Sequence, residues 1–199
     1  MQKYSNARAR LSENDDIERI LDGAKACVAR LGFERTRMEH IAAEAGISRA
    51  TLYRRFAGKE EVFAALLDRE ALPFIARARV IAAESCGIAE RIETILCFAI
   101  DEFGRHDWLS REMTSGLSSQ SLGILNAADR KAAEYAMLPL LREGMAAGEI
   151  LDALPSDELV EWIFRQLVSI SVLDMERAAK HLRVRLLVMP VLASASARA

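Results

Sequence analysis

The stretch from Thr36 to Lys59 constrains this chain more than any other, because its pattern is that of two short helices joined by a tight turn. Thr36 is the predicted N-cap of the first helix, and Glu39 three residues later completes a capping-box pattern. Gly46 can adopt the positive φ that a sharp turn between helices requires. Ser48 is the predicted N-cap of the second helix. The stretch therefore predicts a helix-turn-helix.

The second helix is too short to be stable in water on its own, so its exposed side is expected to serve another purpose. Leu52 and Phe56 lie one turn apart and face a core, with Ile47 as a hydrophobic staple. The remaining positions carry two small residues, a phenol and three guanidinium groups: Arg49, Ala50, Thr51, Tyr53, Arg54 and Arg55. These groups suit guanine edges and phosphates, as on a helix that enters the DNA major groove. The alternative is a plain helical hairpin with a solvated basic face.

Three short motifs within this stretch resemble those of tetracycline-repressor (TetR) type transcription regulators. They are Ala45-Gly46-Ile47-Ser48, then Thr51-Leu52-Tyr53 with Phe56, and then Gly58-Lys59-Glu60. The resemblance spans residues 17–67, and the rest of the chain is similar to the family only in length and helical character. Two positions depart from the family pattern. This chain has Arg55 where the family often has His or Tyr, and Gly58 where Ser or Asn is common.

The resemblance implies an all-α fold of about nine helices in two domains. Residues 14–73 would form the DNA-binding domain, with the helix-turn-helix over 37–56, and residues 74–199 would bind a ligand and form a dimer. Composition agrees with helices, since 51% of the residues are hydrophobic but only 6% are aromatic. The charge is uneven, because residues 1–58 hold 11 Lys and Arg against 8 Asp and Glu, whereas residues 59–199 hold 16 against 21. The basic balance favours DNA contact at the N-terminal end.

The predicted DNA-binding residues lie on both helices and at the start of the helix that follows. They are Thr36, Arg37, Ser48, Arg49, Ala50, Thr51, Tyr53, Arg54 and Lys59. Arg49 and Ala50 begin the second helix, where base edges are nearest. The residues expected on phosphates are Thr51, Tyr53 and Lys59, together with Arg37 and Arg54. Lys59 has an alternative interpretation as an ordinary surface lysine. Residues 1–14 are expected to be a mobile basic segment, which either reaches a minor groove or has no function.

The remaining helices are predicted from apolar periodicity and from punctuating Gly and Pro residues. The expected ranges are 15–31, 59–84 with a kink or break near Leu72 because of Pro73, 88–104, 106–114, 126–147 with a kink at Pro139, 159–173 capped by Ser156, and 174–188 capped by Asp174 and ended by Pro190. Residues 115–123 are the expected loop.

Apolar and sulfur-bearing side chains recur in the second domain, where similar regulators have a small-molecule pocket. The candidates are Phe74, Phe98, Phe103, Trp108, Met113, Tyr135 and Met137. Each has the alternative interpretation of a core residue. The helix over 159–173 is apolar nearly all round, so we expect a second face to be buried between two copies of the chain, together with the last helix. The predicted dimer residues are Val160, Phe164, Val168, Val172 and Leu186, with Leu182, Val184, Leu187 and Val188 also offered by the last helix. A larger core in a monomer is the alternative.

The chain shows no pattern of catalytic or metal-ligating residues. His40, His106 and His181 lie far apart in sequence without a metal-ligand spacing, and no Gly-rich phosphate loop occurs. We therefore expect no enzyme activity, no metal and no cofactor. Three scattered cysteines and the lack of a long apolar segment favour a reduced cytoplasmic protein that does not span a membrane. A redox role for Cys27 is the alternative.

The sequence thus predicts a one-component transcription regulator whose partners are double-stranded DNA, a second copy of itself and an unidentified small effector. It would be a repressor that leaves a palindromic operator when it binds a small apolar ligand. One rival is a regulator that answers to a protein partner rather than to a ligand. Another is a helical enzyme or ligand-binding protein with a vestigial helix-turn-helix.

Overall fold

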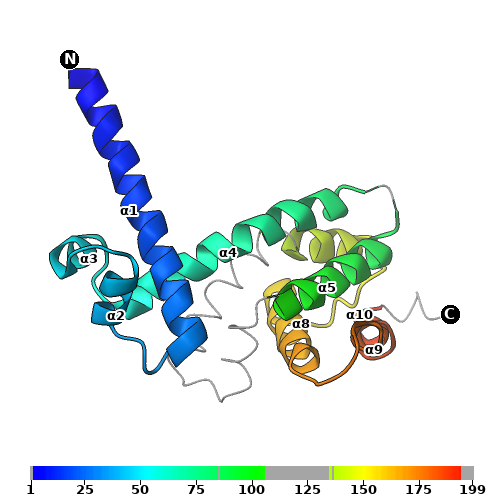
Figure 1. Ribbon diagram of the computed structural model, residues 1–199. Helices are drawn as coiled ribbons and strands as arrows, with labels where there is room; N and C mark the ends of the chain where they lie inside the picture. The colour runs from blue at the N-terminus through cyan, green and yellow to red at the C-terminus, as the bar shows by residue number, and fades with distance from the viewer. Residues whose placement is uncertain (1, 85, 106–134, 136, 194–199) are drawn as a thin grey trace. The chain divides into compact units, whose positions relative to one another are not determined.

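The computed structural model describes residues 2–84, 86–105, 135 and 137–193, with side chains from residue 14 onward. Within these residues the regular secondary structure is helical, apart from an isolated antiparallel bridge between Ile150 and Ala193 (Figure 1). The predicted all-α fold class is confirmed. The helix and loop expected over residues 106–123, and the start of the helix expected from 126, lie outside the described residues.

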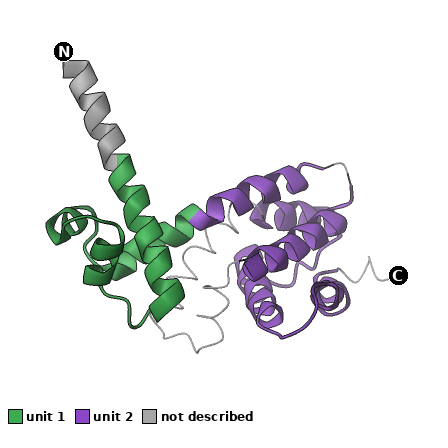
Figure 2. Cartoon of the chain, viewed as in Figure 1, with its two compact units in different colours: residues 1–69, 118–125 green, residues 70–117, 126–199 purple. Residues whose placement is uncertain are grey.

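The chain divides into two compact units, and helix α4 (Lys59–Ala82) contributes to both of them (Figure 2). The described residues up to Arg69 belong to unit 1, and those from Glu70 belong to unit 2. The sequence-based domain boundary between residues 73 and 74 also falls within α4.

Unit 1 packs three helices and the first part of α4 around one apolar core. Helices α1 (Gln2–Leu31), α2 (Met38–Glu44) and α3 (Arg49–Arg55) follow one another along the chain. Phe33 belongs to this core, because it is 5% exposed and its ring contacts the Phe63 ring edge to face, with centroids 4.8 Å apart. The other buried members include Ile20, Leu21, Ala24, Val28, Ile41, Leu52, Phe56 and Leu66.

Helix α1 begins at Gln2, so the predicted helix start at Asp15 is wrong. The polar composition of residues 2–14 suggested an irregular segment, but it holds neither Gly nor Pro. Its Ala, Arg, Leu and Glu residues are good helix formers. Adding residues to an existing helix also avoids the cost of starting a new one.

The predicted cap of α2 is also wrong, because the N-cap is Arg37 and not Thr36. The hydroxyl of Thr36 instead donates a 2.8 Å hydrogen bond back to the Gly32 carbonyl oxygen at the end of α1. Gly32 ends α1 with a φ of 81°, as expected, and the last carbonyls of a helix need donors from outside the helix. The Arg37 amide donates to Nδ1 of His40 at 3.3 Å, so His40 takes the part that was expected of Glu39.

Helix α4 runs through Pro73 without a break, so of the two outcomes predicted near Leu72 the break is wrong and the kink stays a prediction. A proline inside a helix removes one backbone hydrogen bond and costs roughly 3 kcal/mol. The helix buries Val62 and Leu66 in unit 1 before the proline, and Ala78 and Ile81 in unit 2 after it. Burial on both sides of the proline outweighs the lost bond. The helix ends at Ala82, two residues before the predicted Glu84.

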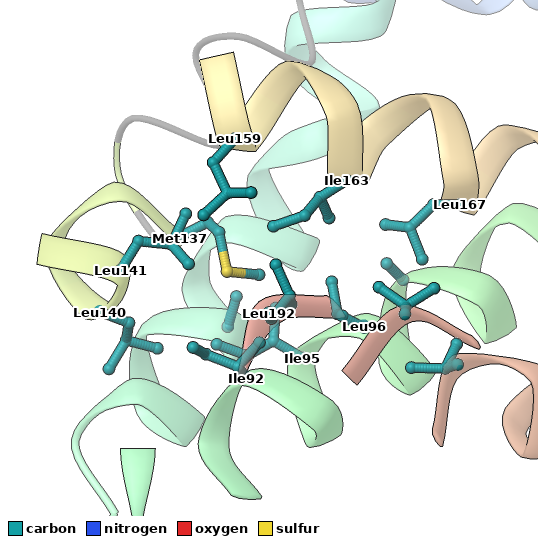
Figure 3. Packing of buried hydrophobic residues seen from close by; sticks show 14 of the residues in the cluster. Ile92, Ile95, Leu96, Met137, Leu140, Leu141, Leu159, Ile163, Leu167 and Leu192 are labelled. Atoms are coloured by element: carbon teal, nitrogen blue, oxygen red, sulfur yellow. The ribbon is translucent and has the colours of Figure 1, made fainter. Parts of the chain in front are cut away.

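Unit 2 packs α5 (Ile88–Arg105), a helix over residues 137–146, α8 (Ser156–Ser171) and the C-terminal helices around a second core (Figure 3). Figure 3 shows Ile92, Ile95 and Leu96 of α5 directed toward the side chains of α8. Leu159, Ile163, Leu167 and Ile170 are 1–7% exposed and form the core face of α8, a helix whose sequence is apolar nearly all round. Gly148 ends the helix over 137–146 with a φ of 72°, as expected.

Three predicted helix boundaries in unit 2 are wrong. The N-cap of α8 is Pro155 rather than Ser156, and α9 (Arg177–Arg183) follows the N-cap Glu176 rather than Asp174. Pro190 does not end the last helix. The π-helix η1 (Val184–Val188) leads into α10 (Met189–Leu192), which contains Pro190. The wider π turn shifts the backbone hydrogen bonds by one residue, so the helix does not need an amide donor at Pro190. It also moves away the carbonyl group with which the proline ring would clash.

Candidate nucleic-acid interface

The two sides of α3 differ sharply in burial. Leu52 is 0% exposed and faces the core, whereas Arg49, Ala50, Tyr53 and Arg54 are exposed. At 100° per residue these four positions lie within about 140° of the helix circumference. The structure therefore brings the predicted base-reading residues, Arg49 and Ala50, onto one exposed face with Tyr53 and Arg54.

Side-chain hydrogen bonds fix both ends of the turn that precedes α3. Oγ of Ser48 accepts a 3.1 Å hydrogen bond from the Thr51 amide, which confirms the predicted cap. The hydroxyl groups of Ser48 and Thr51 also lie 2.9 Å apart. Gly46 has a φ of 63°, as the sequence predicts. The guanidinium of Arg19 in α1 donates to the carbonyl oxygens of Ala45 at 2.9 Å and of Gly46 at 2.8 Å. The turn is thus held from both sides.

The predicted DNA-binding residues outside α3 lie in different environments. Arg37 is exposed at the start of α2. Thr36 is 1% exposed, and its hydroxyl is already bonded to Gly32, so the structure does not bring it to the exposed face of α3. The DNA contacts of these residues stay predictions.

Lys59 has contacts within unit 1 that the sequence did not reveal. Its ammonium donates to the carbonyl oxygens of Phe33 at 3.1 Å and Glu34 at 3.3 Å, and lies 4.4 Å from the centroid of the Phe33 ring. An ammonium group has three N–H donors, and these carbonyls use two of them. Lys59 thereby ties the start of α4 to the segment after α1. Its predicted phosphate contact would share the same ammonium.

A carboxylate lies beside the predicted base-reading arginine. Nη1 of Arg49 is 3.8 Å from Oε1 of Glu39 in α2, and both side chains are partly exposed, by 69% and 41%. Glu44, on the same helix, pairs instead with Arg30 of α1 at 3.2 Å. The electrostatics of the exposed α3 face are therefore set partly by α2.

Sequence reasoning missed three residues that shape this region. Arg19 and Glu39 are brought to the turn and to α3 by the fold, and no local pattern announces either contact. Gly23 did carry a signal, since a glycine inside a helix often marks a close approach. A Cβ atom at Gly23 would lie only 2.9 Å from the Ala45 backbone nitrogen. Helices α1 and α2 therefore pack in close contact at Gly23.

The predicted pocket residues are only partly gathered in unit 2. The rings of Phe74 and Phe98 stack with centroids 5.5 Å apart and planes 6° from parallel. Met137 lies in the hydrophobic core at 6% exposure (Figure 3), whereas Tyr135 is 60% exposed. Phe103 is half-buried. Trp108 and Met113 lie outside the described residues, and the pocket stays a prediction.

The predicted dimer residues form no single buried group within one protomer. Val160, Phe164 and Val168 of α8 and its C-cap Val172 are half-buried, and Leu186 is 59% exposed. Leu182 and Leu187 are also exposed, by 51% and 62%. Val184 and Val188, by contrast, are 0% and 1% exposed in the core of unit 2, so they are not available to a second copy of the chain.

Charged side chains join α5 to the C-terminal helices within unit 2. Asp101 pairs with Arg177 and accepts a 2.9 Å hydrogen bond from Nε2 of His181, and Arg185 donates to Glu93 at 2.6 Å. Cys97 lies between the two acids on α5. Burial, and then the charges of Glu93 and Asp101, raise the pKa of the Cys97 thiol to about 11. Burial likewise raises the pKa of Cys27 in unit 1.

The described residues hold no group of three His, Cys, Asp or Glu side chains that could bind a metal ion. Over the same part of the chain, the helices are too short or too polar for a membrane span.

Comparison with known proteins identifies the helix-turn-helix region. Residues 20–66 match the family model described as "Bacterial regulatory proteins, tetR family". The chain is 29% identical over 145 residues to the HTH-type transcriptional repressor AcnR of Corynebacterium diphtheriae, covering 71% of this chain and 72% of the relative.

Solved structures share the fold over most of the chain. A putative tetR family regulator from Shewanella superposes with a TM-score of 0.74 at 18% identity, over 89% of this chain and 98% of the other. The regulator FadR of Bacillus subtilis, in complex with stearoyl-CoA, gives a TM-score of 0.71 at 19% identity, over 88% and 98% of the two chains. The matched region, which includes the capped, basic helix α3, is thus a helix-turn-helix of the kind found in the tetR family of bacterial regulatory proteins, and the superpositions show that most of the chain shares the fold of such regulators.

Proposed function

We propose that this protein is a homodimeric transcriptional repressor that binds a two-fold symmetric operator through α3 and releases it when a small apolar ligand binds. One observation carries the DNA-binding part. The exposed face of α3 presents Arg49, Tyr53 and Arg54, while Leu52 and the bonded Ser48 cap fix the helix from the other side. Repression is favoured because two relatives are named as HTH-type transcriptional repressors.

Dimer formation is supported by apolar surface that one protomer leaves uncovered. Leu182, Leu186 and Leu187 are each more than half exposed near the C-terminal end of the described residues. Full burial of an exposed leucine side chain is worth about 1.5–3 kcal/mol, so a contact between two copies that covers the exposed part of each leucine gains a share of this. Two copies present two α3 helices, and two-fold symmetry then matches a palindromic site.

Ligand control is supported by the continuity of α4. The helix begins at Lys59 in unit 1 and carries Phe74, which stacks on Phe98, and the core residue Ala78 in unit 2. A ligand that displaces the Phe74 ring would act on the helix that also carries Lys59. We therefore assign α4 as the element that couples the ligand to DNA. The unidentified ligand is expected to be largely apolar, because the candidate residues are aromatic or sulfur-bearing.

A protection footprint on the DNA upstream of the protein's own gene tests the proposal. We expect two protected half-sites about 10–10.5 base pairs apart, or a multiple of this, because successive major grooves on one face are 34–36 Å apart. Uniform protection without boundaries would show that the protein does not read sequence.

Calorimetric titration of a candidate ligand, with and without operator, tests the release mechanism. Coupling of about 1–3 kcal/mol corresponds to a 5–150-fold lower ligand affinity in the presence of operator, since coupling is reciprocal. Equal affinities in the two titrations would exclude this ligand site as the switch and favour control by a protein partner.

A further inference from the structure

The ion pair between Arg49 and Glu39 lies where DNA is expected to approach, and it brings a negative charge to that place. Arg49 is the first residue of α3, and Glu39 is the second residue of α2. Their side chains are 69% and 41% exposed, with Nη1 and Oε1 3.8 Å apart. A carboxylate at a surface that faces phosphates repels them, so it weakens binding to DNA of any sequence. The presence of Glu39 beside Arg49 therefore needs a separate explanation.

The shape of the guanidinium group provides one. Arginine presents five N–H donors in a planar fork, so a carboxylate near Nη1 leaves donors for a second acceptor. Guanine offers two acceptors, N7 and O6, at the major-groove edge, and a bidentate contact to them is strongly base-specific. A phosphate competes for the same donors without regard to sequence. A carboxylate 3.8 Å from Nη1 attracts the guanidinium toward α2 and repels a phosphate that would approach it.

We propose that Glu39 is a specificity-determining residue: it holds Arg49 for contact with a base edge and keeps it from binding phosphates indiscriminately. This inference rests on the proposed DNA-binding function. Its consequence is that Glu39 lowers affinity for random DNA more than affinity for the operator. Loss of its charge frees Arg49 for phosphates, so the ratio of the two affinities falls.

Glu44 offers a matched control on the same helix. Its side chain is 43% exposed, close to the 41% of Glu39, and it also pairs with an arginine. That arginine is Arg30 of α1, which is not among the predicted DNA-binding residues. Glu39→Gln and Glu44→Gln change net charge equally and remove one exposed ion pair each. A general effect of charge on DNA affinity would therefore appear in both variants.

The experiment measures the affinity of the full-length protein and both variants for an operator duplex, defined by footprinting, and for a scrambled duplex over a range of salt concentrations. For Glu39→Gln we expect roughly threefold to tenfold tighter binding to scrambled DNA, since an exposed ion pair is worth up to about fivefold per subunit. The salt dependence on that DNA should steepen by about 0.9 per subunit, because one more phosphate is contacted. Glu44→Gln should match the wild type in both respects, after thermal unfolding has verified that each variant is folded.

A second pair of proteins tests whether Glu39 acts through Arg49. In an Arg49→Ala background, Glu39→Gln should change the scrambled-DNA affinity by less than about twofold, because the arginine that it controls is absent. An unchanged affinity ratio in Glu39→Gln would overturn the inference, as would an equal gain in the Arg49→Ala background. If the wild-type protein itself does not distinguish operator from scrambled DNA, the proposed function fails instead, and the two failures are distinguishable.

Discussion

Substitution of Gly23 by alanine probes the contact between α1 and α2 that positions the helix-turn-helix. A Cβ atom at this position would lie 2.9 Å from the Ala45 backbone nitrogen and 3.2 Å from the Ile41 carbonyl oxygen. These two atoms are the donor and the acceptor of one α2 hydrogen bond, 2.9 Å long. No flexible side-chain end is available to move aside. Relief of the clash requires α2 to shift as a whole.

Two opposing terms decide the sign of the effect. Alanine is favoured over glycine inside a helix by about 1 kcal/mol. Overpacking costs typically 1–3 kcal/mol, and rigid backbone at 2.9 Å places Gly23→Ala near the upper end. The net expectation is a loss of about 2 kcal/mol in the free energy of unfolding. For a chain of this size, that loss lowers the melting temperature by about 4–8 °C.

Thermal unfolding followed by circular dichroism measures the effect, with Gly104→Ala as the matched control. Gly104 lies in α5, and a Cβ atom there would meet no heavy atom within 4 Å apart from its chain neighbours and the backbone of its own helix. The control should therefore leave the melting temperature unchanged or raise it. Operator affinity should fall in Gly23→Ala alone, since α2 leads directly into the turn before α3. A Gly23→Ala protein as stable as the wild type would refute the tight-contact argument.

Three further predictions concern the proposed dimer interface, the contacts of Lys59 and the thiol of Cys97. Leu186→Asp should yield monomers in light scattering, because it places a charge without a partner in the proposed interface. The control Leu154→Asp should stay dimeric, and a dimeric Leu186→Asp protein would contradict the interface. Lys59→Met should lower the free energy of unfolding by about 1–2 kcal/mol in urea titrations, because two hydrogen bonds and the Phe33 ring contact are lost; unaltered stability would reduce Lys59 to a surface residue. Cys97 should react slowly with iodoacetamide at pH 8, since its pKa is about 11, and stability should fall as pH rises from 9.0 toward 11, because the unfolded thiol loses its proton first. If a Cys97→Ala protein lost the same stability over this pH range, the loss would be due to other groups.

Local patterns predicted the elements that local chemistry determines. The Ser48 cap, the positive φ of Gly46 and the core face of α3 each depend on residues within one or two turns, and all three are confirmed. The buried face of α8 likewise has apolar side chains three or four residues apart. In each case the periodicity and the cap agree with the tertiary packing.

Contacts between distant segments account for the errors. Thr36 has the sequence environment of an N-cap, but its hydroxyl group donates instead to the Gly32 carbonyl oxygen after α1. Pro73 breaks helices in general, yet burial on both sides holds α4 together. Pro190 continues a helix because η1 provides a π turn, which no residue pattern announced. The pairing of Glu39 with Arg49 required the α2–α3 angle and could not be read from spacing.

The central claim is that α3 reads bases and not only phosphates. The most direct measurement compares wild type and Arg49→Ala on operator duplexes with single base changes and on scrambled DNA at fixed salt. The account predicts that Arg49→Ala loses about 1–3 kcal/mol of operator affinity per half-site and becomes indifferent to one base pair in it, while its affinity for scrambled DNA changes little. Equal weakening on operator and scrambled DNA would contradict base reading by Arg49.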